Sequence, residues 1–219
     1  MERTITVRGT GRLSVRPDQI SVSLTVRKQD KDYETAMSES ARLLDNLRGA
    51  ICGVGFGRDD LKTVSFNVNT EYEGLRDPDG NYRQVFAGYV CHHQLMIEFP
   101  YDTDKLARVL GAVSICIAEP ELNVSFTVKD REALTEELLK NAAENARLRA
   151  ETLAKASDEE LGRLVSISYN WKENNFVSPT FFGGEMKMLR AETENAGRID
   201  ITAQDIDVSE NAVFVWEIK

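Results

Sequence analysis

The stretch Asp130–Ser157, DREALTEELLKNAAENARLRAETLAKAS, decides the fold, because it is the longest helical pattern in the chain and contains no Gly or Pro. Apolar or small residues recur in it at intervals of three and four, and charged residues fill the other positions. A helix of this length spans about 40 Å and can cover a sheet from edge to edge. Alanine fills the middle of its apolar stripe and lets the helix backbone lie close to the sheet. The stripe consists of Leu134, Leu138, Leu139, Ala142, Ala143, Ala146, Ala150, Leu153 and Ala154.

Alternation of apolar and polar residues predicts strands before and after this helix. The first strand, at 5–15, contains Gly9-Thr10-Gly11, and we expect it to bend or bulge at the glycines. In the fourth strand the odd positions are apolar and predict one apolar face. The expected strands are 5–15, 20–26, 64–68, 85–99, 122–128, 165–171 and 206–218.

Two shorter helices are predicted between these strands. One follows Asp30 or Asp32 and the other follows Asp102 or Thr103, side chains that cap helix N-termini well. The order of elements from Ile20 to Val128 is then strand, helix, two strands, helix and strand, as in a split βαβ unit. We therefore expect an α+β fold with a mainly antiparallel sheet, two shorter helices, and the long helix of about 130–156 packed on the sheet.

A single layer of strands covered by the long helix is expected, and we interpret 1–219 as one domain because no repeat or low-complexity linker divides it. Residues at about 172–205 form an aperiodic arm, and an arm this long is usually functional or disordered. It carries a group of large apolar residues that mark a contact surface if they are exposed. Folding back onto the sheet is the equal alternative. These possible interaction residues are Phe176, Phe181, Phe182, Met186, Met188 and Leu189.

The composition is that of an ordinary globular protein, with 42% hydrophobic and 29% charged residues. The formal net charge of -9 argues against nucleic acid or an anionic membrane as a partner. No apolar run approaches the roughly 20 residues of a transmembrane helix. Three widely spaced cysteines indicate a reducing compartment or three buried small residues. Because no signal peptide precedes the first strand pattern, we expect a cytoplasmic protein, with the periplasm or cell envelope as the alternative for a trimmed chain.

Cys91, His92 and His93 are weak pocket candidates. Adjacent histidines on a strand point to opposite faces, whereas Cys91 and His93 share one face. That face is apolar, and zinc needs three or four ligands, so we expect no metal site. Gly53-Val54-Gly55-Phe56-Gly57 follows a helix and Gly9-Thr10-Gly11 lies within a strand, so neither glycine group predicts a cofactor site. No nucleophile motif is present either, and we expect no catalytic residue.

Several short motifs, taken in order, resemble the SIMPL domain family, which includes YggE-like proteins and proteins like a periplasmic immunogenic antigen. The resemblance covers almost the whole chain. It implies an α+β domain that self-associates, in some relatives into ring-like assemblies, with links to oxidative or envelope stress and no established catalytic activity. The motifs are Val7-Arg8-Gly9-Thr10-Gly11, Val15-Arg16-Pro17-Asp18, Gly88-Tyr89, Ala146-Arg147, Arg149-Ala150-Glu151, Leu153-Ala154, residues 161–168 and Ile206-Asp207-Val208-Ser209.

Two functions are consistent with these residues. The first is a non-enzymatic, self-associating protein without a cofactor, which is a homo-oligomer and has a stress-related role. The second is a small-molecule- or metal-binding protein, or an undescribed enzyme, with a pocket near His92 and His93.

Overall fold

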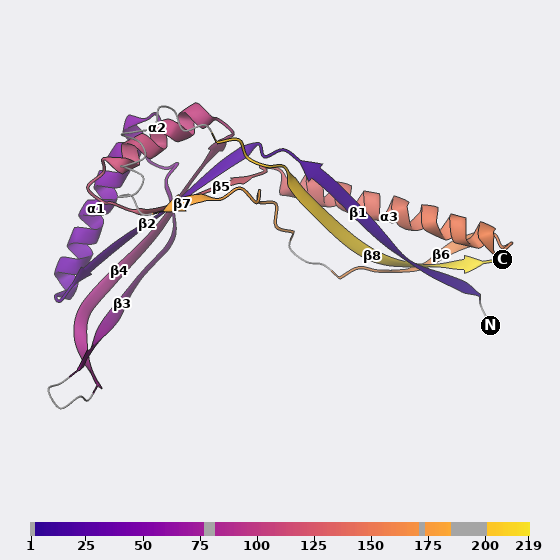
Figure 1. Cartoon of the computed structure of the whole chain (residues 1–219), viewed down its shortest axis with the longest axis horizontal. Helices are drawn as coiled ribbons and strands as arrows, with labels where there is room; N and C mark the ends of the chain where they lie inside the picture. The colour runs from indigo at the N-terminus through magenta and orange to yellow at the C-terminus, as the bar shows by residue number, and fades with distance from the viewer. Residues whose placement is uncertain (1–2, 77–81, 171–173, 185–200) are drawn as a thin grey trace. The chain divides into compact units, whose positions relative to one another are not determined.

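The computed structural model of the chain describes residues 3–76, 82–170, 174–184 and 201–219 (Figure 1). Within these residues three helices accompany two sheets, which confirms the α+β class. The strands divide between these two sheets, so the expected single layer is wrong. Contacts divide the chain into two compact units. Unit 1 comprises Met1–Asp18, Thr127–Pro179 and Ala203–Lys219, and unit 2 comprises Gln19–Phe126 and Thr180–Thr202.

Unit 1 is a three-stranded sheet covered by the long helix. The strand order is β1-β8-β6, and both pairs are antiparallel. Figure 1 shows α3 running alongside β1 and β8. The elements are β1 (Thr4–Val15), α3 (Arg131–Ala156), β6 (Leu161–Ser168) and β8 (Ile206–Ile218).

The alanine stripe of α3 packs on this sheet, as the sequence predicts. Ala142, Ala146 and Ala150 are completely buried, and Ala146 and Ala150 lie in one cluster with Phe214 and Trp216 of β8. Side chains this small hold the helix axis close to the strands, because little volume separates the two backbones.

The glycines of β1 have a different role from the one that the sequence suggests. The pairing of β1 with β8 runs without a shift from Thr4 opposite Glu217 to Val15 opposite Ile206, so the expected bulge is wrong. A Cβ atom on Gly9 would collide with the carbonyl oxygen of Ala142, and one on Gly11 with that of Leu138. The glycines are needed because the backbone of α3 touches the strand there.

Unit 2 contains the predicted split βαβ unit with one short extra strand. The sheet order is β3-β4-β2-β5-β7, and β4 pairs antiparallel with both β2 and β3. Helix α1 packs on β2 and β4, and α2 packs beside α1. The elements are β2 (Gln19–Asp30), α1 (Tyr33–Gly53), β3 (Lys62–Arg76), β4 (Tyr82–Pro100), α2 (Thr103–Ser114), β5 (Glu121–Thr127) and β7 (Phe182–Gly184).

Local capping sets the start of each helix. Asp32, Asp102 and Asp130 each accept a hydrogen bond from a backbone N–H group three residues later. The structure therefore selects Asp32 over Asp30 and Asp102 over Thr103, and each of these caps satisfies a donor that the helix itself cannot.

The strand at Gln19–Asp30 has the predicted apolar alternation, and Ile20, Val22, Leu24 and Val26 are fully buried. The last predicted strand matches β8, and β6 covers the start of the predicted 165–171 strand. Within the described ranges, no helix combines the length and the apolar run that crossing a bilayer requires. The single domain over 1–219 stays a prediction.

Candidate functional site

Strand β4 separates the three pocket candidates. Cys91 and His93 share its buried face, while His92 lies on the opposite face between Arg27 and Asn67 of the flanking strands. Cys91 Sγ lies 3.8 Å from Met37 Sδ, and burial raises the pKa of the Cys91 thiol. A buried protonated thiol against a thioether is a packing arrangement, so Cys91 adds no reactive group to the histidines.

His93 is held between strand β3 and helix α1. Its Nε2 atom lies 3.1 Å from the Thr63 hydroxyl oxygen, and its ring centroid lies 5.0 Å from that of Phe66. Burial lowers the pKa of His93, and the positive charge of Arg48 lowers it further. A neutral imidazole suits this position, because it can form the hydrogen bond to Thr63 without placing a second cation near Arg48.

The lowered pKa of His93 predicts a loss of stability in mild acid. The unfolded histidine takes up a proton below a pKa of about 6.5, whereas the folded one stays neutral to a lower pH. The unfolded state then binds more protons, and the free energy of unfolding falls as the pH falls below about 6.5. His93→Gln should reduce this dependence in urea unfolding curves at neutral pH and near pH 5, whereas His92→Gln should leave it in place. Equal pH dependence in the wild type and His93→Gln would refute the assignment.

The candidate residues therefore form no converging set. Across the described part of the chain, no group of three His, Cys, Asp or Glu side chains is close enough to hold a metal ion. An apolar groove of about 420 Å³ lies between α1 and α2, with Ile115 and Ile117 among its lining residues. Both isoleucines are largely exposed, but neither His92 nor His93 is among the residues that line the groove.

The aperiodic arm places its described phenylalanines in different surroundings. Phe176 is buried with Val128, Leu138 and Ile206, and its carbonyl oxygen accepts a hydrogen bond of 2.7 Å from the Thr127 hydroxyl. It thus folds back into the core of unit 1. Phe181 is 75% exposed, and Phe182 is half-buried in β7 opposite Val124. The other possible interaction residues, Met186, Met188 and Leu189, lie outside the described residues.

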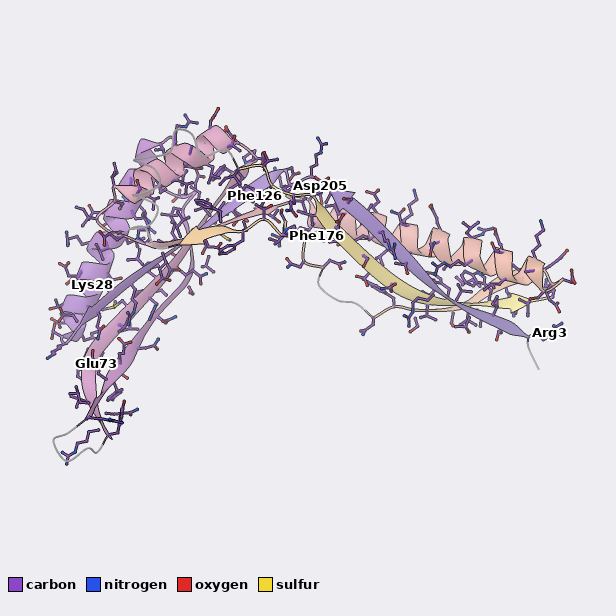
Figure 2. All side chains as sticks on the ribbon, viewed as in Figure 1. Arg3, Lys28, Glu73, Phe126, Phe176 and Asp205 are labelled. Carbon is purple, nitrogen blue, oxygen red and sulfur yellow. The ribbon has the colours of Figure 1, made fainter. Side chains whose placement is uncertain are left out.

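Another group of exposed apolar side chains lies on the hairpin of β3 and β4. We define the distal hairpin as residues 72–76 and 82–86, the part that contains Glu73 in Figure 2. Its large side chains are far more exposed than those of a half-buried strand, at 54% for Leu75, 55% for Tyr72 and 72% for Tyr82. Leu75 and Val85 lie on one face of the hairpin, and the aromatic side chains lie on the other. Exposed apolar groups that gather on one element are a mark of contact surfaces. The set is Tyr72, Leu75, Tyr82, Val85 and Phe86.

Ring contacts organise this surface. Phe86 contacts Tyr72 edge-on with centroids 6.0 Å apart, and it contacts Tyr89 at 5.2 Å. Tyr89 in turn contacts Tyr33 at the start of α1. At the far end, the Arg76 guanidinium lies 5.5 Å from the centre of the Tyr82 ring. Such edge-on contacts fix the rings in place and present a preorganised aromatic surface.

A register shift between β3 and β4 places Tyr72 opposite Phe86. Because of this shift, the apolar–polar alternation of the sequence does not predict which side chains of the distal hairpin are exposed. The register shifts between Glu71 and Tyr72, opposite Gly88, whose φ of 146° is unusual for any residue with a side chain. A shift of one residue reverses which side chains face which side of a strand. Val85, which the odd-position pattern places on the apolar face, is consequently 46% exposed. The sequence contains one indication of this shift, because an isolated glycine such as Gly88 within a strand pattern suggests a bulge.

Comparison with known proteins gives two findings. The family described as "SIMPL: Protein of unknown function (DUF541)" matches residues 5–216. The chain is also 26% identical over 215 residues to the "26 kDa periplasmic immunogenic protein" of Brucella melitensis biotype 1, and the same figures apply to that of Brucella abortus strain S19. Each alignment covers 98% of this chain and 84% of the relative.

The names of these relatives overturn the expected cytoplasmic location, because both are called periplasmic. The cysteines do not require a reducing compartment either. Cys91 and Cys116 are buried, and Cys52 is exposed, so the alternative of three buried residues holds for two of them.

Proposed function

Because this chain belongs to the SIMPL family, we propose that it is a non-enzymatic periplasmic protein that acts by self-association. The observation that carries this proposal is the exposed aromatic and aliphatic surface of the distal hairpin. Isolated exposed apolar side chains are normal on protein surfaces, but five large ones on a single hairpin indicate a contact site. The periplasmic part rests on the names of the two relatives.

The composition of the distal hairpin suits a protein contact. Tyrosine, phenylalanine and arginine are the residues enriched in the centres of interfaces, and here they are Tyr72, Tyr82, Phe86 and Arg76. Their mutual ring contacts reduce the rotamer freedom that binding would otherwise remove. A second copy of the same chain offers a partner with a matching aromatic surface, as in an isologous interface.

Self-association predicts a mass well above that of one chain. The wild type should elute in size-exclusion chromatography with a light-scattering mass that is a multiple of 24.6 kDa. Leu75→Glu combined with Phe86→Glu places two charges on the distal hairpin and should lower that mass. Ile115→Glu combined with Ile117→Glu, on another exposed apolar site, is the matched control and should leave it unchanged. Circular dichroism establishes that the variants are folded. A wild type that stays monomeric at high concentration would exclude the proposal.

A stress-related role is the further expectation from the family resemblance. It predicts that a strain lacking this protein survives oxidants or envelope-damaging agents less well than its parent, and that the gene restores survival. Equal survival of the two strains would count against this role without touching self-association.

A further inference from the structure

The two edges of the unit 1 sheet differ in how their backbone groups are covered. The strand order β1-β8-β6 places β1 and β6 at the two edges of the sheet. An uncovered strand edge presents unpaired N–H and C=O groups to any other strand, and proteins usually protect such edges. The protection of one edge and not the other is therefore informative.

Helix α3 protects the β1 edge. The side-chain oxygen of Asn145 accepts a hydrogen bond of 3.1 Å from the backbone N–H group of Thr10. The Arg149 guanidinium donates to the carbonyl oxygen of Arg8 at 3.2 Å. Both backbone groups belong to alternate residues on the side of β1 that faces away from β8. The close approach of α3 over Gly9 and Gly11 brings these side chains within reach of the edge.

The same placement of α3 leaves β6 uncovered. The helix contacts β1 most, β8 less and β6 least. In the described part of the chain, β6 pairs with β8 through two register shifts, between Leu161 and Leu164 and between Leu164 and Ser166, and no backbone hydrogen bond reaches its outer edge. Leu164, Val165 and Ile167 are 45%, 48% and 55% exposed. Three aliphatic side chains at a free edge are an aggregation liability unless another strand covers them.

We propose that β6 pairs antiparallel with β6 of a second copy, so that two unit 1 sheets join into one six-stranded sheet. This inference rests on the proposed self-association and assigns it a second surface, independent of the distal hairpin. A two-fold axis between Val165 and Ser166 places Leu164 directly opposite Ile167 of the second copy, and the reverse pair forms on the other side of the axis.

The residues of β6 are self-complementary in this register. Leu164 and Ile167 are three residues apart but lie on the same face, because the register of β6 shifts between Leu164 and Ser166 and pairs them with Trp216 and Phe214 of β8, which both face α3. An apolar residue therefore meets an apolar residue across the axis, the kind of cross-strand pair that stabilises sheets. The one charged residue between 161 and 168, Arg163, is already paired with Glu217 and would lie opposite Ser168 of the second copy. No like charges oppose each other.

A symmetric disulfide tests this register. Ser166 of each copy lies next to the axis, with its Cα atoms about 6 Å apart and on the same face, which is within disulfide range. In a background in which Cys52→Ser removes the exposed native thiol, Ser166→Cys should cross-link to a dimer rapidly under mild oxidation. Ser14→Cys, an exposed position on the protected β1 strand, should cross-link at least ten times more slowly. Equal rates at the two positions would overturn the proposal.

A charge exchange provides the second test. Ile167→Lys places a cation opposite Leu164 of the second copy. It should raise the dimer dissociation constant at least tenfold in analytical ultracentrifugation. Adding Leu164→Glu to the same chain places opposite charges across the axis and should restore most of that loss. If the wild type is assembled but Ile167→Lys has no effect, or Leu164→Glu gives no rescue, the β6 interface is wrong and self-association stands. A monomeric wild type would exclude both.

Discussion

Replacing Gly9 and Gly11 together by alanine is expected to lower the free energy of unfolding of unit 1 by about 3 kcal/mol or more. Each new Cβ atom would lie well under 3.0 Å from a backbone atom of α3, namely the carbonyl oxygens of Ala142 and Leu138. A backbone group cannot rotate away as a side chain can. The whole helix must therefore move off the strand, and the buried alanine contacts are lost. Urea unfolding followed by circular dichroism measures the change.

Two further variants make this result specific to the helix–strand contact. Ala146→Leu enlarges the helix side of the contact and should cost about 1–3 kcal/mol. Gly49→Ala is the matched control, because a Cβ atom there meets nothing within 4 Å and alanine favours a helix interior by about 1 kcal/mol. It should leave stability equal or higher. If Gly9→Ala with Gly11→Ala costs no more than this control, α3 does not press on β1.

Gly88→Ala is expected to destabilise unit 2 by about 3 kcal/mol and to disturb the distal hairpin. A Cβ atom at Gly88 would lie 2.5 Å from the carbonyl oxygen of Asp30, and the φ of 146° adds backbone strain for any residue with a side chain. Relief of the strain would alter the register shift that brings Phe86 opposite Tyr72. Loss of stability should therefore be accompanied by a lower assembly mass in light scattering.

Gly55→Ala separates the two causes of that effect. Gly55 also has a positive φ, 97°, but a Cβ atom there has open space around it. It should cost about 1 kcal/mol, from backbone conformation alone. Equal costs at Gly55 and Gly88 would mean that the contact with Asp30 is unimportant.

Much of the fold follows from local patterns. The alternation at Ile20–Val26, the alanine stripe of α3 and the aspartate caps of the two shorter helices depend on residues that are close in sequence, and each is confirmed. The split βαβ order follows from the same elements. The sequence also predicts that His92 and His93 do not meet at one site, because a period of two places them on opposite faces of any regular strand.

Other features depend on contacts between residues that are far apart in the sequence. The role of Gly9 and Gly11 depends on a helix more than 120 residues later. The sequence alone does not distinguish a glycine that bends a strand from one that allows a helix to pack closely on it. The exposure of the distal hairpin depends on the shift at Gly88 and on which strand lies at the sheet edge. The burial of Phe176 depends on Leu138 and Ile206, which surround it from two distant segments.

The sequence by itself determined the kind of each main element and the apolar face of α3, and it reduced the cap of each shorter helix to two candidates, because these features arise from side-chain periodicity and short-range hydrogen bonds. Only the tertiary structure decided that the strands form two sheets and that α3 lies over β1 and leaves β6 open. Strand pairing is made by backbone groups that are the same in every residue, so the choice of partner depends on packing across the whole chain.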